Sequence, residues 1–495
     1  MKMYINSNWV DKPETIAVLN PFDQSVIDTV PRGTVSDVEL AITSAVRGAK
    51  AMAKLTAYER YAILRRAADL MAERAEDLGR TITLEEGKVI SEGRGEVQRA
   101  IQTITISSEE AKRLHGETVP LDAAPGNFNQ FGFTIRVPVG VVAAISPFNF
   151  PLNLVCHKVG PALAAGNAVV LKPAGDTPLS ALKLTEILLE AGLPEEAIQC
   201  VTGPGGEIGD ALTGDPRVRK ITFTGSMEVG DRICRNAGIK KITMELGSNS
   251  PLIVMSDADI EKVAAATVSG GFGNAGQVCI STQRVFADRR IYADFLDALV
   301  APTEAFATGN PLDESVKMGP MIRGADAERV GRWIAEAVDG GARIVTGGDH
   351  EGTMHAPTVV ADATPDMRIS REELFGPAVA VSAFNDIDEA IAMANDSRFG
   401  LSAGIFTQNL DWAMRFAKEV DSGSLHINSS PQWARRPDAL RWPQRQRYGQ
   451  GRTVICCVGD ERAKNGGVSP VGGVASRYRI PGWILVSPTT STILI

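Results

Sequence analysis

The chain has 495 residues, which is more than one compact core normally holds, so we expect two or three domains. Its net charge of -8 argues against nucleic acid or an anionic membrane surface as the main partner. No apolar stretch approaches the roughly 20 residues of a membrane span, and the first residues lack the apolar core of a signal peptide. The six cysteines show no metal-ligand spacing and are too sparse for a disulfide scaffold, so we expect a cytoplasmic protein without a metal.

Residues 36–114 carry apolar side chains at helical spacing, and Ser36 and Asp37 are expected to cap the first helix. From residue 133 the pattern changes to alternating strands and helices. A strand pair is expected at 133–147, helices at 152–166, 180–192 and 207–214, and single strands at 167–173, 197–203 and 220–226. This order predicts an α/β fold with a mostly parallel sheet, and a second alternation follows from about 250 to 425.

Three candidate catalytic groups lie far apart along the chain. Cys279 lies in GFGNAGQVC, where small neighbours let a carbonyl reach the sulfur, although most buried cysteines are inert. Glu245 ends the strand-like KKITME, as a general base would, and the alternative is a surface carboxylate. Asn149 lies between the prolines of SPFNFP, and its fixed amide either donates to an oxyanion or forms a structural turn.

Two further strand ends are candidate nucleotide contacts. Lys172 ends the strand before LKPA, and Gly225 and Ser226 lie at a strand-to-helix turn that could bind a pyrophosphate. Neither forms a GxGxxG fingerprint, so each alone is a weak signal.

Together these motifs resemble the aldehyde dehydrogenase superfamily in their order and gaps. The matching motifs are PFNFP, LKPA, FTGS, MELG, GQVC and the ELFGP that begins at Glu373. The resemblance covers about residues 1–433. It implies that Cys279 attacks an aldehyde carbon, that Asn149 and the Cys279 backbone N–H hold the oxyanion, and that hydride leaves to a nicotinamide. Glu245 would then activate water to release the acid, and Lys158 matches a further family position near the chemistry.

The resemblance also implies the architecture and the cofactor contacts. A Rossmann-like NAD(P)-binding domain would comprise residues 1–119 and 139–246, with a bridging and oligomerisation hairpin at 120–138 and an α/β catalytic domain at 247–433. Lys172 and Glu373 would hold the riboses, Phe375 would pack beside the nicotinamide, and Ser226 would meet the pyrophosphate. The other implied cofactor residues are Ile145, Ser146, Pro147, Phe148, Ala174, Gly175, Gly205, Gly209, Phe223, Thr224, Gly225, Val229, Leu246 and Gly247.

NAD is the expected cofactor, and NADP is possible because Gly175 lies where NAD-preferring relatives often carry a glutamate. The chain looks most like the lactaldehyde, phosphonoacetaldehyde and non-phosphorylating glyceraldehyde-3-phosphate group, so we expect a short hydroxylated or anionic aldehyde. Val278 lies where phosphate-binding members often have arginine. Arg113, His157 and Arg284 are the candidate anion contacts, although a structural role is favoured for each.

The segment after Trp433 departs from the family pattern. Back-translated with a one-base shift, residues 438–453 can encode MPYGGLKDSGMGKEG, which matches the family's ending. We therefore predict a frame shift near residue 433 and an aberrant tail at 434–495 in place of the family's oligomerisation strand. Loss of that strand is expected to leave a sheet edge uncovered, and it puts the implied homodimer or homotetramer in doubt.

Two alternatives stay open. A CoA-acylating dehydrogenase is disfavoured by Glu245, because such relatives typically lack this glutamate. A catalytically silent nucleotide-binding or scaffold protein would follow if the altered tail cripples the enzyme.

Overall fold

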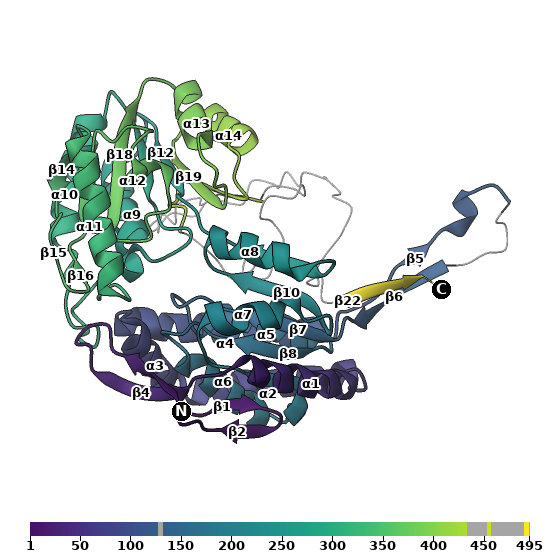
Figure 1. Ribbon diagram of the computed structural model, residues 1–495. Helices are drawn as coiled ribbons and strands as arrows, with labels where there is room; N and C mark the ends of the chain where they lie inside the picture. The colour runs from purple at the N-terminus through teal and green to yellow at the C-terminus, as the bar shows by residue number, and fades with distance from the viewer. Residues whose placement is uncertain (127–131, 433–452, 457–489, 495) are drawn as a thin grey trace, which may run out of the picture.

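The computed structural model describes residues 1–126, 132–432, 453–456 and 490–494. Figure 1 shows two α/β bodies, one above the other, with a narrow β arm that extends away from the lower body. Within the described residues, no helix combines the length and the apolar character needed to cross a bilayer.

The lower body contains a seven-stranded sheet in the order β11-β10-β7-β8-β9-β1-β2. The five strands from β11 to β9 run parallel, while β1 and β2 form an antiparallel hairpin at one edge. These strands are β1 (Met3–Ile5), β2 (Asn8–Val10), β7 (Val141–Ile145), β8 (Ala168–Lys172), β9 (Ile198–Cys200), β10 (Val218–Thr224) and β11 (Lys241–Glu245), and a separate hairpin pairs β3 (Thr15–Leu19) with β4 (Val26–Pro31).

Helices cover both faces of this sheet, and each face has its own apolar core. The helices are α1 (Val35–Met52), α2 (Ala57–Glu73), α3 (Ala75–Glu86), α4 (Ile90–Ala111), α5 (Asn153–Ala164), α6 (Leu179–Glu190), α7 (Gly205–Gly214) and α8 (Met227–Ala237). The predicted alternation of strands and helices from residue 133 is therefore confirmed. The four N-terminal strands were not predicted, because they are short and carry little alternation.

The predicted cap of the first helix is wrong by two residues. Helix α1 begins at Val35, and its N-cap is Thr34 rather than Ser36. The Asp37 carboxylate accepts the Thr34 N–H at 2.7 Å, so Thr34 and Asp37 form the reciprocal pair of a capping box. Both Thr34 and Ser36 are favourable cap residues, and the position of Asp37 selects the first of them.

The upper body contains an eight-stranded sheet in the order β14-β17-β18-β13-β12-β19-β20-β21. All its pairs are parallel except the β14–β17 pair at one edge. Its strands are β12 (Pro251–Val254), β13 (Arg284–Asp288), β14 (Arg343–Thr346), β17 (Thr358–Ala361), β18 (Ala378–Phe384), β19 (Ser402–Phe406), β20 (Ser424–Ile427) and β21 (Thr453–Cys456), and β15 (His350–Glu351) pairs with β16 (Met354–His355) in a short hairpin. Its helices are α9 (Ile260–Phe272), α10 (Tyr292–Glu304), α11 (Gly324–Asp339), α12 (Arg368–Arg371), α13 (Ile387–Asn395) and α14 (Leu410–Glu419).

The arm is a three-stranded antiparallel sheet in the order β22-β6-β5, formed by β5 (Thr118–Val119), β6 (Gly132–Pro138) and β22 (Thr490–Leu494). Two strands of the predicted aberrant tail are thus described: β21 pairs with β20, and β22 pairs with β6. The edges formed by β20 and β6 are therefore covered within the chain, while the loss of the family's oligomerisation strand stays a prediction. Most of the frame-shift prediction lies outside the described residues.

Candidate active site

The site lies at the carboxyl edge of the lower sheet. From β7 the chain adds β8 and β9 on one side, and it then returns to add β10 and β11 on the other. The strand order therefore reverses between β7 and β10, and ligands of open parallel sheets bind in the crevice at such a point. Asn149 follows β7, Lys172 ends β8, Ser226 follows β10 and Glu245 ends β11.

The other predicted cofactor residues follow the same strands. Ile145, Ser146, Pro147 and Phe148 lie at the end of β7, Ala174 and Gly175 follow β8, Gly205 and Gly209 lie in α7, Phe223, Thr224 and Gly225 lie at the end of β10, Val229 lies in α8, and Leu246 and Gly247 follow β11. The topology thus brings these segments to one edge of the sheet.

Cys279 follows a loop with an unusual backbone. Asn274 (φ 52°), Ala275 (φ 52°) and Gly276 (φ 68°) are consecutive left-handed residues. This conformation costs an alanine about 1 kcal/mol, so the surroundings must hold it. At Gly276 a Cβ atom would lie 2.1 Å from the Gly376 carbonyl oxygen, which explains why only glycine fits there. The loop thereby fixes the backbone that leads to the partly exposed Cys279.

Asn149 is joined directly to this loop. Its Nδ2 donates to the carbonyl oxygen of Gln277 at 2.7 Å, and Asn149 is buried. An amide nitrogen carries two hydrogens, so a second donor is left for a substrate oxygen. Asn149 is therefore joined to the segment that lies two residues before Cys279, although the two are far apart in the sequence.

Two carboxylates of the site, those of Glu245 and Glu373, affect the pKa of the Cys279 thiol. Burial raises the pKa of Cys279 well above its ordinary value, and the charges of Glu245 and Glu373 raise it further. The resting form at neutral pH is therefore the thiol, and a base must take its proton before the sulfur attacks. Glu245 is buried at the end of β11 and is the carboxylate with the larger effect.

Lys158 lies beside Glu245. Its Nζ donates to the Thr224 hydroxyl at 2.5 Å, and Thr224 is the register partner of Glu245 in the neighbouring strand. Burial lowers the pKa of Lys158 to about 8, while the charge of Glu245 raises it. The charges of Lys158 and Glu245 therefore act on each other at this edge of the sheet.

Glu373 and Phe375 form the wall of the site that comes from the upper body. Burial raises the pKa of Glu373 to about 7, and its Oε1 accepts the Ser248 N–H at 2.9 Å. A Cβ atom on Gly247 would lie 2.0 Å from Glu373 Oε2, so the carboxylate approaches this backbone closely. The Phe375 ring meets the Phe148 ring edge-on, with 5.8 Å between their centroids.

Lys172 and Ser226 lie on the side of the lower body. Burial lowers the pKa of Lys172 to about 8, and its Nζ donates to the Pro173 carbonyl at 2.9 Å. A Cβ atom on Gly205 would lie 3.9 Å from this Nζ, which places the lysine at the N-terminus of α7. Ser226 caps α8 by accepting the Val229 N–H, and a Cβ atom on Gly175 would meet nothing within 4 Å.

Two of the three predicted substrate residues have other partners. Arg113 is exposed near the end of α4 and pairs with Glu110. Arg284 is buried in β13, and its guanidinium donates to the backbone carbonyls of Asn249, Met393 and Ala394 at 2.9–3.1 Å. These contacts use three of the five guanidinium N–H donors and tie Arg284 to the backbone, so it has a structural role, whereas Arg113 is exposed to solvent. A contact of either residue with a substrate anion stays a prediction.

His157 belongs to a polar group that the sequence did not reveal. Thr103 Oγ1 donates to Asn153 Oδ1 at 3.0 Å and lies 3.5 Å from His157 Nε2. Asn153 and His157 are four residues apart, about one helical turn, so they lie on the same face of α5. The four-residue spacing could have pointed to this polar group, but such a spacing is informative only where the segment is known to be a helix.

A small apolar cluster lies beside the nucleophile. Val278, Ile280 and Leu401 form this cluster, and Phe150 and Cys279 pack against it. The sulfur of Cys279 therefore has apolar neighbours.

A comparison with known proteins decides the family, because residues 9–438 match the model of the Aldehyde dehydrogenase family. The chain belongs to this family. Over 450 residues, covering 91% of this chain and 94% of the relative, it is 47% identical to the 3-sulfolactaldehyde dehydrogenase of Priestia aryabhattai. It is 39% identical to the succinate-semialdehyde dehydrogenase [NADP(+)] GabD of Escherichia coli, with 86% and 89% of the two chains covered.

Solved structures of other aldehyde dehydrogenases share the fold. Aldehyde dehydrogenase 21 from Physcomitrella patens, in complex with the reaction product succinate, superimposes with a TM-score of 0.85 at 38% identity, covering 88% of this chain and 90% of that one. Glyceraldehyde-3-phosphate dehydrogenase GapN from Methanocaldococcus jannaschii, complexed with NADP, gives 0.83 at 34% identity, with 86% and 92% covered. The predicted α/β fold and the enzyme class are confirmed, and the family match ends close to the predicted frame shift.

Proposed function

We propose that this aldehyde dehydrogenase oxidises a short anionic aldehyde to its carboxylic acid, with NAD or NADP as the oxidant and Cys279 as the nucleophile. The observation that carries this proposal is the convergence of Asn149, Glu245 and Cys279, through the Asn149–Gln277 hydrogen bond and the effect of Glu245 on the thiol. Oxidation by NAD(P) rests on the family and on relatives such as the one solved with NADP.

The residues that line the crevice are suited to bind a dinucleotide. Lys172 and Glu373 are buried polar groups on opposite sides of it, and they are suited to bind ribose hydroxyl groups. The open space at Gly175 leaves room next to an adenosine ribose, and it places no carboxylate against a 2′-phosphate. Either NAD or NADP is therefore accepted. The bound NAD(P)+ supplies the acceptor for the hydride that leaves the substrate carbon.

The residues of the chain carry out the remaining steps. Glu245 takes the thiol proton of Cys279, and the sulfur forms a bond to the aldehyde carbon to give a thiohemiacetal. The Asn149 amide donates to the oxyanion that forms on the former carbonyl oxygen. After loss of hydride the product is a thioester on Cys279. Glu245 passes the thiol proton to solvent and then takes a proton from water, the hydroxide attacks the thioester carbon, and the C–S bond breaks to release the acid. The Cys279 sulfur leaves as a thiolate and regains its proton from Glu245.

The polar group on α5 supports a small polar substrate. Thr103, Asn153 and His157 provide hydrogen-bonding atoms on α4 and α5, and the Arg99 guanidinium lies 5.0 Å from the centroid of the Phe150 ring, which packs against the same apolar cluster as Cys279. A short chain ending in an anion would place its aldehyde at the sulfur and its charged end among these groups. The relatives named for sulfolactaldehyde and succinate semialdehyde support the same class.

Steady-state kinetics with an aldehyde panel test this function. We expect kcat/KM to be highest for sulfolactaldehyde, succinate semialdehyde or phosphonoacetaldehyde and lower for the uncharged lactaldehyde, and we expect Cys279→Ala to abolish reduction of NAD(P). Cys234→Ala is the matched control, because Cys234 is an exposed cysteine in α8. A preference for long apolar aldehydes would refute the substrate class, and activity retained in Cys279→Ala would refute the mechanism. Formation of a CoA thioester would identify CoA as the acyl acceptor in place of water.

A further inference from the structure

A buried ion pair lies behind the proposed oxyanion donor. Lys88 Nζ donates to Glu96 Oε2 at 2.7 Å, and both side chains are almost completely shielded from solvent. Lys88 follows α3 and Glu96 lies in α4, outside every motif that the sequence singled out. Removing two charges from water costs free energy that their attraction only partly returns, so this ion pair is not explained by stability alone.

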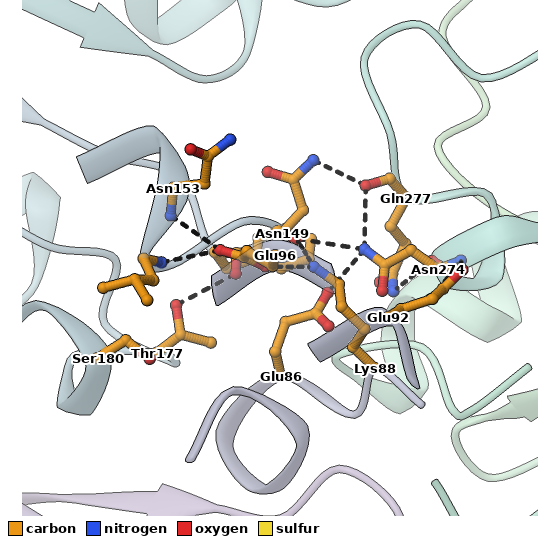
Figure 2. A network of polar contacts seen from close by, with 12 residues as sticks. Glu86, Lys88, Glu92, Glu96, Asn149, Asn153, Thr177, Ser180, Asn274 and Gln277 are labelled. Carbon is orange, nitrogen blue, oxygen red and sulfur yellow. Dashed lines mark hydrogen bonds and ion pairs between the residues drawn. The ribbon is translucent and has the colours of Figure 1, made fainter. Parts of the chain in front are cut away.

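The two partners of this ion pair hold the Asn149 loop. Lys88 Nζ also donates to the main-chain carbonyl of Asn149 at 2.8 Å. Glu96 Oε1 accepts the N–H groups of Leu152 and Asn153, both at 3.0 Å, at the start of α5. In Figure 2 the lysine and the glutamate lie directly beneath Asn149, and the dashed lines run from them into its loop.

The lysine also reaches the side chain after Asn149. Its Nζ lies 3.8 Å from the centroid of the Phe150 ring, within the range of a cation–π contact. Phe150 packs against the cluster that contains Cys279. One ammonium group therefore contacts the backbone of the amide donor and the ring beside the nucleophile.

Two neighbouring acids hold the nucleophile loop from the same body. Glu86 Oε1 accepts from Asn274 Nδ2 at 2.9 Å, and the Glu92 carboxylate accepts the Asn274 N–H at 3.2–3.3 Å. Asn274 Nδ2 also lies 3.3 Å from the Asn149 carbonyl oxygen, the same atom that Lys88 contacts. Figure 2 shows Asn274 between these acids and Gln277, so one polar network joins the amide donor to the left-handed turn before Cys279.

We propose that Lys88 and Glu96 are positioning residues for the reaction at Cys279, acting by holding the Asn149 loop so that its amide meets the oxyanion. This inference rests on the proposed cysteine mechanism. Among the described residues, the hydrogen bonds and the ring contact of Lys88 lead to the Asn149–Phe150 segment or to Glu96, and its charge also acts on Glu86 and Glu92. The consequence is specific: removing the ammonium lowers the rate of the chemical steps, and it leaves cofactor binding unchanged.

A double-mutant cycle between Lys88→Met and Asn149→Ala tests this coupling. The readouts are kcat for the aldehyde, the rate of p-nitrophenyl acetate hydrolysis without cofactor, and the Kd of NADH. We expect Lys88→Met to lower both rates by about 30-fold, somewhat less than the 10²- to 10³-fold that loss of an oxyanion donor typically costs. The Kd of NADH is expected to stay within about two-fold. In the Asn149→Ala background, Lys88→Met is expected to cost less than about three-fold, because the amide it positions is gone.

Lys183→Met is the matched control. Lys183 Nζ donates to Asp77 at 2.6 Å and to Thr81 at 2.8 Å, so this variant breaks an ion pair in the same body that does not lead to Asn149. Since Lys88→Met leaves Glu96 buried without its partner, the double variant Lys88→Met/Glu96→Gln is measured as well. It removes both charges and still lacks the donor to Asn149, so we expect the same loss of rate in a stably folded protein.

The outcomes separate this inference from the proposed function. Multiplicative losses in the cycle, or normal rates in the double variant, would overturn the role of Lys88 and Glu96. Full turnover in Asn149→Ala or in Cys279→Ala would overturn the cysteine mechanism itself. A loss confined to Asn149→Ala, with Lys88→Met like Lys183→Met, would leave the mechanism intact and reject the positioning role alone.

Discussion

Gly247→Ala is the smallest change that should weaken cofactor binding without touching the thiol. The new Cβ atom would lie 2.0 Å from Glu373 Oε2, 2.5 Å from Cδ and 2.6 Å from Oε1. Contacts under about 3 Å cannot persist, so the whole carboxylate must move by roughly 1 Å or more. A hydrogen bond to a charged group contributes about 1.5–3 kcal/mol. At about 1.4 kcal/mol for each factor of ten, loss of the proposed ribose contact raises the Kd of NADH roughly 10- to 150-fold.

Fluorescence titration with NADH measures this Kd, and alkylation of Cys279 by iodoacetamide without cofactor is measured in parallel. The alkylation rate should change less than about two-fold. The matched control is Gly95→Ala in α4, where a Cβ atom meets nothing within 4 Å and the helix is expected to gain about 0.5–1 kcal/mol. If Gly247→Ala binds NADH as tightly as the parent enzyme, the assignment of Glu373 to the cofactor is wrong.

Three further changes have defined outcomes. Glu245→Gln removes a charge that raises the Cys279 pKa, so the pH profile of alkylation should shift to lower pH, and an unchanged profile would contradict the proximity of these groups. Arg284→Met leaves three backbone carbonyls without donors and should lower the free energy of unfolding by about 3 kcal/mol. The value of kcat/KM for anionic aldehydes should change less than two-fold. A large loss of kcat/KM confined to anionic aldehydes would show that Arg284 contacts the anion. Glu86 has its pKa raised by burial to about 8, so between pH 4.5 and 8 only the unfolded chain ionises and stability falls as the pH rises. Glu86→Gln should flatten that fall in urea unfolding curves, and parallel curves for the two proteins would refute the burial argument.

The order of strands and helices around the site could be predicted because each segment carries a strong local pattern. Strands β7 and β8 are continuous apolar runs, and the residues that bear the chemistry follow strand ends, where a parallel sheet exposes its carboxyl edge. Asn149, Glu245 and Cys279 were therefore found from motif order, and the structure adds the hydrogen bond and the electrostatic effect that join them.

For charged side chains, burial was the hardest property to predict from the sequence. In the sequence, Arg284 is a candidate anion contact, and Lys88 belongs to no motif with an expected role. The structure buries both, because backbone carbonyls surround the first and Glu96 accompanies the second. Whether a charge is exposed depends on packing between distant elements, and neither periodicity nor spacing encodes that. The same holds for the polar group of Thr103, Asn153 and His157, which forms only when α4 packs on α5.

The covalent intermediate is the most direct test of the account. Glu245→Gln is mixed with succinate semialdehyde and NADP+, quenched in acid and digested, and the peptide that contains Cys279 is weighed by mass spectrometry. We predict that this peptide carries the acyl group as a thioester, formed along with one equivalent of NADPH, because the lower pKa of Cys279 in this variant lets the thiol lose its proton to solvent. The thioester is released slowly, because the base that activates water is gone. An unmodified Cys279 peptide in an enzyme that still reduces NADP+ would contradict the role of Cys279 as the nucleophile.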